Sequence, residues 1–104
     1  AYSASKGGVR TMTKSIALDL AERETGIRVN SIHPGFAETP LVEKAIAQLE
    51  PDAGQQFFAR LAERALLGLA DPDQIAAAAV FLFSDDSSFM TGSELVVDGG
   101  FTAS

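Results

Sequence analysis

The sequence predicts an α/β protein built on a small parallel sheet. Long segments with helical spacing of apolar residues alternate along the chain with two short segments that have the composition of strands. Helices that separate strands usually serve as crossovers between parallel strands of one sheet. Two strands are too few to bury both faces of a sheet, so the pattern alone defines only part of a fold.

The chain opens with a long helix and a strand. Residues 2 to about 24 are predicted to form one amphipathic helix, and Gly26 is a suitable stop just after it. Residues 27–32 then alternate apolar and polar side chains, which is typical of a strand. The apolar residues of the helix recur at steps of three and four: Val9, Met12, Ile16 and Leu20.

The middle of the chain reads as two short helices over residues 40–50 and 54–67, with Pro51 and Gly54 between them. Thr39 is a suitable N-cap for the first helix, because a proline follows at the first helical position.

A further helix and strand complete the pattern. Asp71 and Gln74 have the spacing of a capping box, which predicts a helix start at that point. Residues 94–97 form a last short strand. The apolar side chains of the helix are Ile75, Ala79, Val80, Leu82 and Phe83.

Composition excludes several classes of function. A chain of 104 residues with 46% hydrophobic and 21% charged residues should fold as one soluble domain at most, and we expect it in the cytoplasm. A net charge of −6 argues against a nucleic-acid partner. The absence of cysteine excludes disulfides and, with a single histidine, disfavours a metal site. No apolar run is long enough to cross a membrane.

Tyr2 and Lys6 form a candidate catalytic pair. A spacing of four places both side chains on one face of a helix, one turn apart. The pKa of a free phenol is about 10, and a nearby ammonium lowers it by favouring the phenolate. Tyr2 could therefore act as a general acid or base that Lys6 tunes. The alternative is an ordinary surface pair, because this spacing is common in helices.

Several motifs together resemble the C-terminal part of the short-chain dehydrogenase/reductase family. The Tyr-x-x-x-Lys spacing fits the ordinary short members of the family rather than the divergent enoyl reductases. The motif Asp98-Gly99-Gly100 near the end of the sequence argues against the longer sugar-epimerase branch. The resemblance implies a doubly wound Rossmann-type sheet, of which this chain holds the last two strands. Its motifs are Tyr2–Lys6, 27–35, Thr39-Pro40, Asp71-Pro72, 81–85, Thr91-Gly92 and 97–100.

The resemblance implies roles for Tyr2 and Lys6. Tyr2 would donate a proton to a carbonyl oxygen as hydride arrives from nicotinamide, or remove it in the oxidative direction. Lys6 would lower the pKa of Tyr2 and also hold the ribose hydroxyls of the cofactor. His33 precedes the Pro-Gly turn, and we interpret it as a packed or partly exposed residue rather than a base. Arg28 and Asn30 are assigned structural duties.

The segment from Pro34 to Thr39 is the second part of the implied cofactor site. Gly35 would let the backbone approach the nicotinamide ring closely. Ala37 would bind the carboxamide through backbone amide groups, and Thr39 would offer its hydroxyl. From the residues alone, an ordinary turn at a strand end is the favoured interpretation of Pro34 and Gly35. Thr39 is also a suitable N-cap, and it can fill both roles at once.

We expect residues 1–104 to be the catalytic and substrate-lid portion of one Rossmann domain, without the N-terminal cofactor-binding half. No Gly-x-x-x-Gly-x-Gly turn occurs in the chain. The residue that selects between NAD and NADP should precede this chain, so both cofactors, NAD and NADP, stay open. By itself the chain should be inactive.

The resemblance places the substrate lid at residues 40–67, and the apolar composition of that segment favours an apolar substrate. The implied reaction interconverts a secondary alcohol and a ketone, on a steroid-like or alicyclic alcohol or a 3-oxoacyl group. Relatives commonly form homodimers or homotetramers. The alternative is a truncated, non-enzymatic fragment that self-associates or serves as an interaction module.

Overall fold

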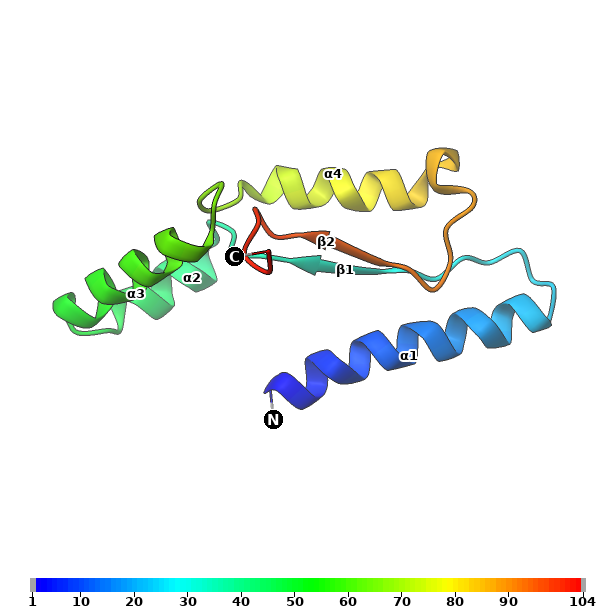
Figure 1. Cartoon of the computed structure of the whole chain (residues 1–104), viewed down its shortest axis with the longest axis horizontal. Coiled ribbons are helices and arrows are strands. Elements are labelled where there is room, and N and C mark those ends of the chain that lie inside the picture. Colours follow the sequence, from blue (N-terminus) through cyan, green and yellow to red (C-terminus); the bar gives the residue numbers. More distant parts are fainter. Residues whose placement is uncertain (1, 104) are drawn as a thin grey trace. The chain divides into compact units, whose positions relative to one another are not determined.

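A computed structural model describes residues 2–103, apart from the side chains of Tyr2 and Ala62. Helices and strands follow the predicted order (Figure 1). The chain shows the expected α/β architecture, of which its described residues contain two strands and the helices that connect them. The elements are α1 (Tyr2–Glu22), β1 (Ser31–Pro34), α2 (Pro40–Ala47), α3 (Pro51–Arg64), α4 (Pro72–Phe83), a 3₁₀ turn (Asp85–Ser87) and β2 (Glu94–Val97).

Strands β1 and β2 pair in a two-stranded sheet. The N–H of Ser31 donates to the carbonyl of Ser93 at 3.0 Å, and the N–H of Gly35 donates to the carbonyl of Val97 at 2.9 Å. The partners advance together by four residues, so the strands are parallel, as the alternation of elements predicts.

The predicted position of the first strand, residues 27–32, is wrong by several residues. Before Ser31 the backbone bonds to a loop rather than to a strand. The N–H of Val29 donates to the hydroxyl of Thr91 at 3.1 Å, and its carbonyl accepts from the N–H of Gly92 at 2.6 Å. Alternation of side chains therefore began before the backbone ladder did.

The predicted helix boundaries also need correction. Helix α1 ends at Glu22 rather than about residue 24, and Gly26 follows with a φ of 72°. Pro51 is the first residue of α3 rather than a separator, because a proline at that position loses no helical hydrogen bond. Gly54 is consequently buried inside α3. Helices α2 and α3 end about three residues before their predicted ends, at Ala47 and Arg64.

The chain divides into two compact units. Unit 1 comprises Ala1–His33 and Ala78–Leu95, and unit 2 comprises Pro34–Ala77 and Val96–Ser104. Each has a very small core among the described residues. The buried side chains of unit 1 are Thr13, Ala17, Ser31 and Ser87, and the buried apolar side chains of unit 2 are Leu61 and Ala65.

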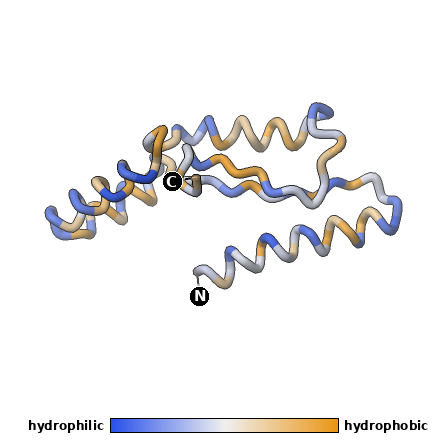
Figure 2. The backbone as a smooth tube through the Cα atoms, viewed as in Figure 1, coloured by the Kyte–Doolittle hydropathy of each residue, from blue (hydrophilic) through white to orange (hydrophobic). Residues whose placement is uncertain are grey.

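Most large apolar side chains remain exposed. In the predicted stripe of α1, Val9, Met12 and Ile16 are 42%, 57% and 40% exposed, and the buried positions of that helix are Thr13 and Ala17 instead. Apolar character also runs along β2 and much of α4 (Figure 2). None of the helices in the described residues has the length and apolar character needed to cross a membrane.

In unit 1, helix α1 is fastened to the segment that enters β2. Glu94 accepts from Arg10 at 2.9 Å and from Lys14 at 3.4 Å, and the ammonium of Lys14 also donates to the carbonyl of Gly92 at 3.0 Å. The hydrogen bond from Arg10 is the main reason that the pKa of Glu94 lies below its ordinary value. These contacts lie near the surface, so each contributes modestly to stability.

Arg28 closes the C-terminal end of α4, where the last carbonyls of a helix lack helical partners. Its guanidinium donates to the carbonyls of Leu82 at 3.0 Å, Ser84 at 3.2 Å and Met90 at 3.2 Å. The side-chain amide of Asn30 donates to the carbonyl of Met90 and accepts from the N–H of Ser93, both at 3.0 Å. The predicted structural duties of Arg28 and Asn30 are confirmed.

Replacing Arg28 by lysine should lower the free energy of unfolding by about 2 kcal/mol, because one ammonium cannot reach three separate carbonyls and hydrogen bonds to charged groups are the stronger ones. Urea unfolding of the whole protein measures this loss. The matched control is Arg23→Lys, whose ion pair with Asp19 is exposed. Equal losses in the two variants would contradict the assigned role of Arg28.

Candidate functional site

Tyr2 and Lys6 lie in the first turns of α1, in unit 1. The helix is continuous from Tyr2 onward, so Lys6 is one turn further along its backbone. The side chain of Lys6 is exposed. The side chain of Tyr2 lies outside the described part of the chain, and the catalytic roles of both residues stay predictions.

Gly35 follows directly after β1, in unit 2, and lies in tight contact with the C-terminal turn. A Cβ at this position would lie 2.8 Å from Cα and 2.9 Å from the carbonyl oxygen of Asp98. Such distances are too short for any side chain. Glycine is therefore required here by the approach of the protein's own backbone, in addition to the predicted approach of a cofactor ring.

Ala37 lies in an extended segment that pairs with residue 70. A parallel bridge joins Ala37 to Ala70: the carbonyl of Phe36 accepts from the N–H of Ala70, and the N–H of Glu38 donates to its carbonyl, both at 2.9 Å. Backbone groups of successive residues alternate sides in an extended chain. The N–H and carbonyl of Ala37 therefore point away from Ala70.

Thr39 is the N-cap of α2, as predicted. Its backbone is extended, and its hydroxyl oxygen accepts from the N–H of Val42 at 3.4 Å, with Pro40 at the start of the helix. A hydroxyl that accepts one bond still has its own hydrogen to donate. The capping role thus leaves Thr39 able to serve the predicted cofactor contact as well.

His33 is partly buried at the end of β1. Its Nε2 lies 2.8 Å from the hydroxyl of Ser31, two residues earlier on the same face of the strand. This local bond agrees with the structural role predicted for His33.

Asp98 organises the turn that covers Gly35. One carboxylate oxygen accepts from the N–H of Gly100 at 2.9 Å. The other accepts from the hydroxyl of Thr102 at 2.6 Å and from its N–H at 2.9 Å. These bonds, that of the Thr102 hydroxyl first, hold the pKa of Asp98 below its ordinary value of 3.8. Asp98 thus acts as a turn residue through its own carboxylate.

The Asp98 bonds should make stability depend on pH. Because the pKa is lower in the folded state, the stabilisation is present above about pH 4 and is lost as pH falls through the folded pKa. The melting temperature of Asp98→Asn should therefore lie below that of the wild type at pH 6, and the gap should narrow toward pH 3. Asp86→Asn, at an exposed site, is the control. A gap that stays constant with pH would contradict this explanation.

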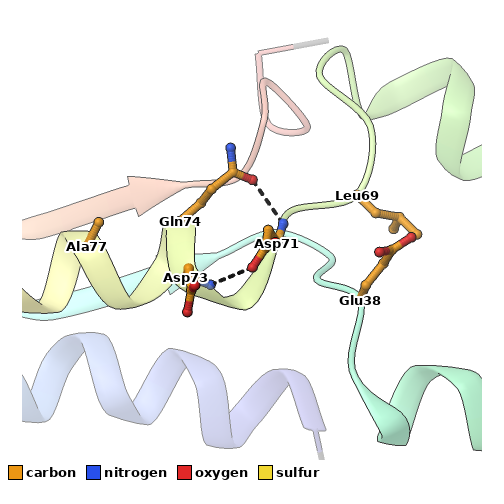
Figure 3. A pocket seen from close by; sticks show the side chains of 6 residues that line it. All are labelled: Glu38, Leu69, Asp71, Asp73, Gln74 and Ala77. Carbon is orange, nitrogen blue, oxygen red and sulfur yellow. Dashed lines mark hydrogen bonds between the residues drawn. The ribbon is translucent and has the colours of Figure 1, made fainter.

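An open hollow of about 780 Å³ lies beside the start of α4, in unit 2. Figure 3 shows its lining residues: Glu38, Leu69, Asp71, Asp73, Gln74 and Ala77. Two of these residues, Asp71 and Gln74, form half of the predicted capping box: the N–H of Asp71 donates to the side-chain oxygen of Gln74 at 2.9 Å. The carboxylate of Asp71 accepts from the N–H of Asp73 at 2.9 Å rather than from that of Gln74. The Asp71 carboxylate thus caps the N-terminus of α4, where negative charge is favourable.

Sequence reasoning did not find the hollow, because Glu38 reaches it from another segment. In the part of the chain that the structure describes, no group of three or more acidic, histidine or cysteine side chains could hold a metal ion.

Pro34 thus ends β1, and the next residues form one segment of unit 2 that is hydrogen-bonded to residues 70 and 97 and packs on residue 98. That segment contains Gly35, Ala37 and Thr39. Lys6 and the backbone of Tyr2 belong to unit 1. The loop's geometry is compatible with the contacts predicted for a nicotinamide cofactor.

Comparisons with known proteins identify the family. A family model described as enoyl-(acyl carrier protein) reductase matches residues 1–102. The chain belongs to the short-chain dehydrogenase/reductase family. The spacing of four between Tyr2 and Lys6 still favours the ordinary short members over the divergent enoyl reductases, and that distinction remains a prediction.

Characterised relatives are similar over nearly the whole chain. The NADP-dependent (R)-specific alcohol dehydrogenase of Lentilactobacillus kefiri is 43% identical over 103 residues, which is 99% of this chain and 38% of that protein. Cyclopentanol dehydrogenase of Comamonas sp. is 48% identical, with the same coverage. A solved structure of 4-hydroxyisoleucine dehydrogenase complexed with NADH is 34% identical, with a TM-score of 0.79 over 99% of this chain and 40% of that one. The chain therefore spans about two fifths of the length of these proteins.

Proposed function

We propose that the whole protein carrying this chain is an NAD(P)-dependent oxidoreductase that interconverts a secondary alcohol and a ketone. The observation that carries the proposal is the family match through residues 1–102, which includes Tyr2 and Lys6 at the family's spacing. Two relatives named for alcohol oxidation support it.

In this proposal Tyr2 is the general acid or base and Lys6 tunes it and holds the ribose. Pro34, Gly35, Ala37 and Thr39 form the loop beside the nicotinamide. The bound cofactor would supply or accept the hydride. The backbone groups of Ala37 that face away from Ala70 and the remaining hydrogen of the Thr39 hydroxyl support these roles. Either NAD or NADP fits, since the relatives include examples of both.

The substrate is proposed to be apolar, either a steroid-like or alicyclic alcohol or a 3-oxoacyl group. In and around the lid helices of unit 2, Leu41, Leu66 and Leu67 are 78%, 65% and 85% exposed. Exposed leucine side chains of this kind are suited to line a binding site for an apolar ligand.

The test is a spectrophotometric assay of the whole protein with each of the four nicotinamide cofactors. Cyclopentanol, cyclohexanol, a hydroxysteroid and a 3-oxoacyl thioester cover the proposed classes, and an aldose is the polar control. Turnover of at least one apolar substrate above the aldose supports the proposal. Turnover of the aldose alone would overturn the apolar assignment, and no cofactor-dependent turnover would overturn the function.

A second candidate function is a self-associating or interaction module without catalysis. The exposed apolar side chains of α1 favour it, as does Val96 in β2, which is 51% exposed. The mass of the purified natural protein distinguishes the two: a chain of only 104 residues favours the module, and a longer chain that turns over an alcohol with a nicotinamide cofactor would overturn it.

For the whole protein we propose a homodimer or homotetramer that covers the exposed stripe of α1 and the last strand. Closed two-fold assemblies are the commonest solution for such surfaces. Light scattering that gives the mass of a monomer at micromolar concentration would contradict this.

A further inference from the structure

Aromatic rings link three segments of unit 2 that are far apart in the sequence. Phe36, which follows Gly35 in the loop after β1, lies edge-to-face with Phe57 of α3, with ring centroids 6.0 Å apart and planes at 81°. The same ring lies edge-to-face with Phe101 of the C-terminal tail, at 5.5 Å and 67°. Phe36 therefore stands between the lid helix and the tail.

Arg64 provides a second contact between helix α3 and the C-terminal tail. Its guanidinium carbon lies 4.4 Å from the centroid of the Phe101 ring, a cation–π geometry. Just beyond α3, the N–H of Leu67 donates to the carbonyl of Gly99 at 3.0 Å. A Cβ on Gly100 would lie 2.9 Å from a methyl group of Leu66, so the tail packs closely against the end of the lid.

These contacts depend on ring geometry more than on burial. Phe36 and Phe57 are each 36% exposed, and Arg64 is exposed. Leu61 in the second half of α3 and Ala65 at its C-cap are deeply buried, and Gly54 is buried near the start of the helix. Phe57 lies between these buried positions, so loss of its contact with Phe36 should loosen the middle of α3.

We infer that Phe36 and Phe101 are positioning residues that fix the lid helix α3 against the loop at residues 34–39 and so set the affinity for substrate. The inference rests on the proposed function, since that function makes α3 part of a substrate lid. A helix held by few contacts opens easily, and each lost contact raises the open fraction. A more open lid weakens substrate binding without altering the groups that carry out proton transfer.

The test uses the whole protein with Phe101→Leu and hydrogen exchange of the backbone amides of residues 51–65. An aromatic pair contributes enough that exchange should be about three- to tenfold faster in this variant. Exchange in residues 7–20 is the internal reference and should not change. Phe101→Tyr keeps the ring and should behave as the wild type. Phe89→Leu, at a side chain without burial, is the matched control and should also be unchanged.

Kinetics provide the second measurement. Phe101→Leu should raise KM for the alcohol about three- to tenfold and leave kcat within about twofold, since it removes binding rather than chemistry. Phe36→Leu should have the same effect on exchange. In the double variant, the increase in exchange rate should be smaller than the product of the two single increases, because both substitutions remove the same contact between Phe36 and Phe101.

The two proposals can fail separately. Unchanged exchange in α3 of Phe101→Leu overturns the inference even in an active enzyme, as does an effect of equal size in Phe89→Leu. Fully multiplicative effects in the double variant would also overturn it. Absence of any alcohol turnover overturns the proposed function, and faster exchange in α3 would then still support the link between lid and tail.

Discussion

Replacing Tyr2 by phenylalanine should lower kcat of the whole enzyme by about 100- to 10,000-fold and leave cofactor affinity almost unchanged. The change removes one hydroxyl and keeps the ring, so a proton donor is lost while packing is preserved. Steady-state assay with the best alcohol, together with fluorescence titration of the reduced cofactor, measures both quantities. Ser3→Ala, at the neighbouring exposed position, is the control.

Lys6→Met should differ from Tyr2→Phe in a defined way. It should lower kcat and also weaken cofactor binding, because Lys6 is proposed to tune Tyr2 and hold the ribose. Retention of a tenth or more of wild-type turnover by Tyr2→Phe would refute the role of Tyr2. Unchanged cofactor affinity in Lys6→Met would refute the second role of Lys6.

Gly35→Ala should destabilise the protein by about 1–3 kcal/mol, because inserting a carbon into a close-packed contact forces backbone to move. The added Cβ would lie within 3.0 Å of three backbone atoms of Asp98, and a backbone cannot move aside as a flexible side chain can. Cofactor affinity should fall as well, since the displaced loop includes Ala37 and Thr39.

Gly54→Ala is the matched control for Gly35→Ala. Its Cβ would meet a methyl group of Ile46 at 3.7 Å, an ordinary contact, and the residue lies within helix α3. Alanine there should stabilise the protein by roughly 0.5–1 kcal/mol, because glycine loses more backbone freedom on folding. Urea unfolding of both variants measures the pair. Equal stability of Gly35→Ala and wild type would show that the Asp98 turn is not held as closely as the structure indicates.

Local sequence determined the order of the helices and strands and the start of two helices, but not most of their ends. Thr39 before a proline and Asp71 three residues before Gln74 predicted helix starts that the structure confirms, because capping needs only side chains and backbone a few residues apart. Residues 94–97 were recognised as a strand with its correct bounds. Pro51 was misread, since proline either ends a helix or begins one, and only the surrounding chain decides which.

Contacts between distant segments were decided by the tertiary structure. Helical spacing by itself identified only Tyr2 and Lys6 as a candidate pair. The family resemblance added the other candidate site residues: Pro34, Gly35, Ala37 and Thr39. The sequence could not show that Asp98 packs on Gly35, that Arg28 closes α4, or that Phe36 lies between Phe57 and Phe101. Each of these depends on how the chain returns to itself over tens of residues, and local propensity carries no information on that return.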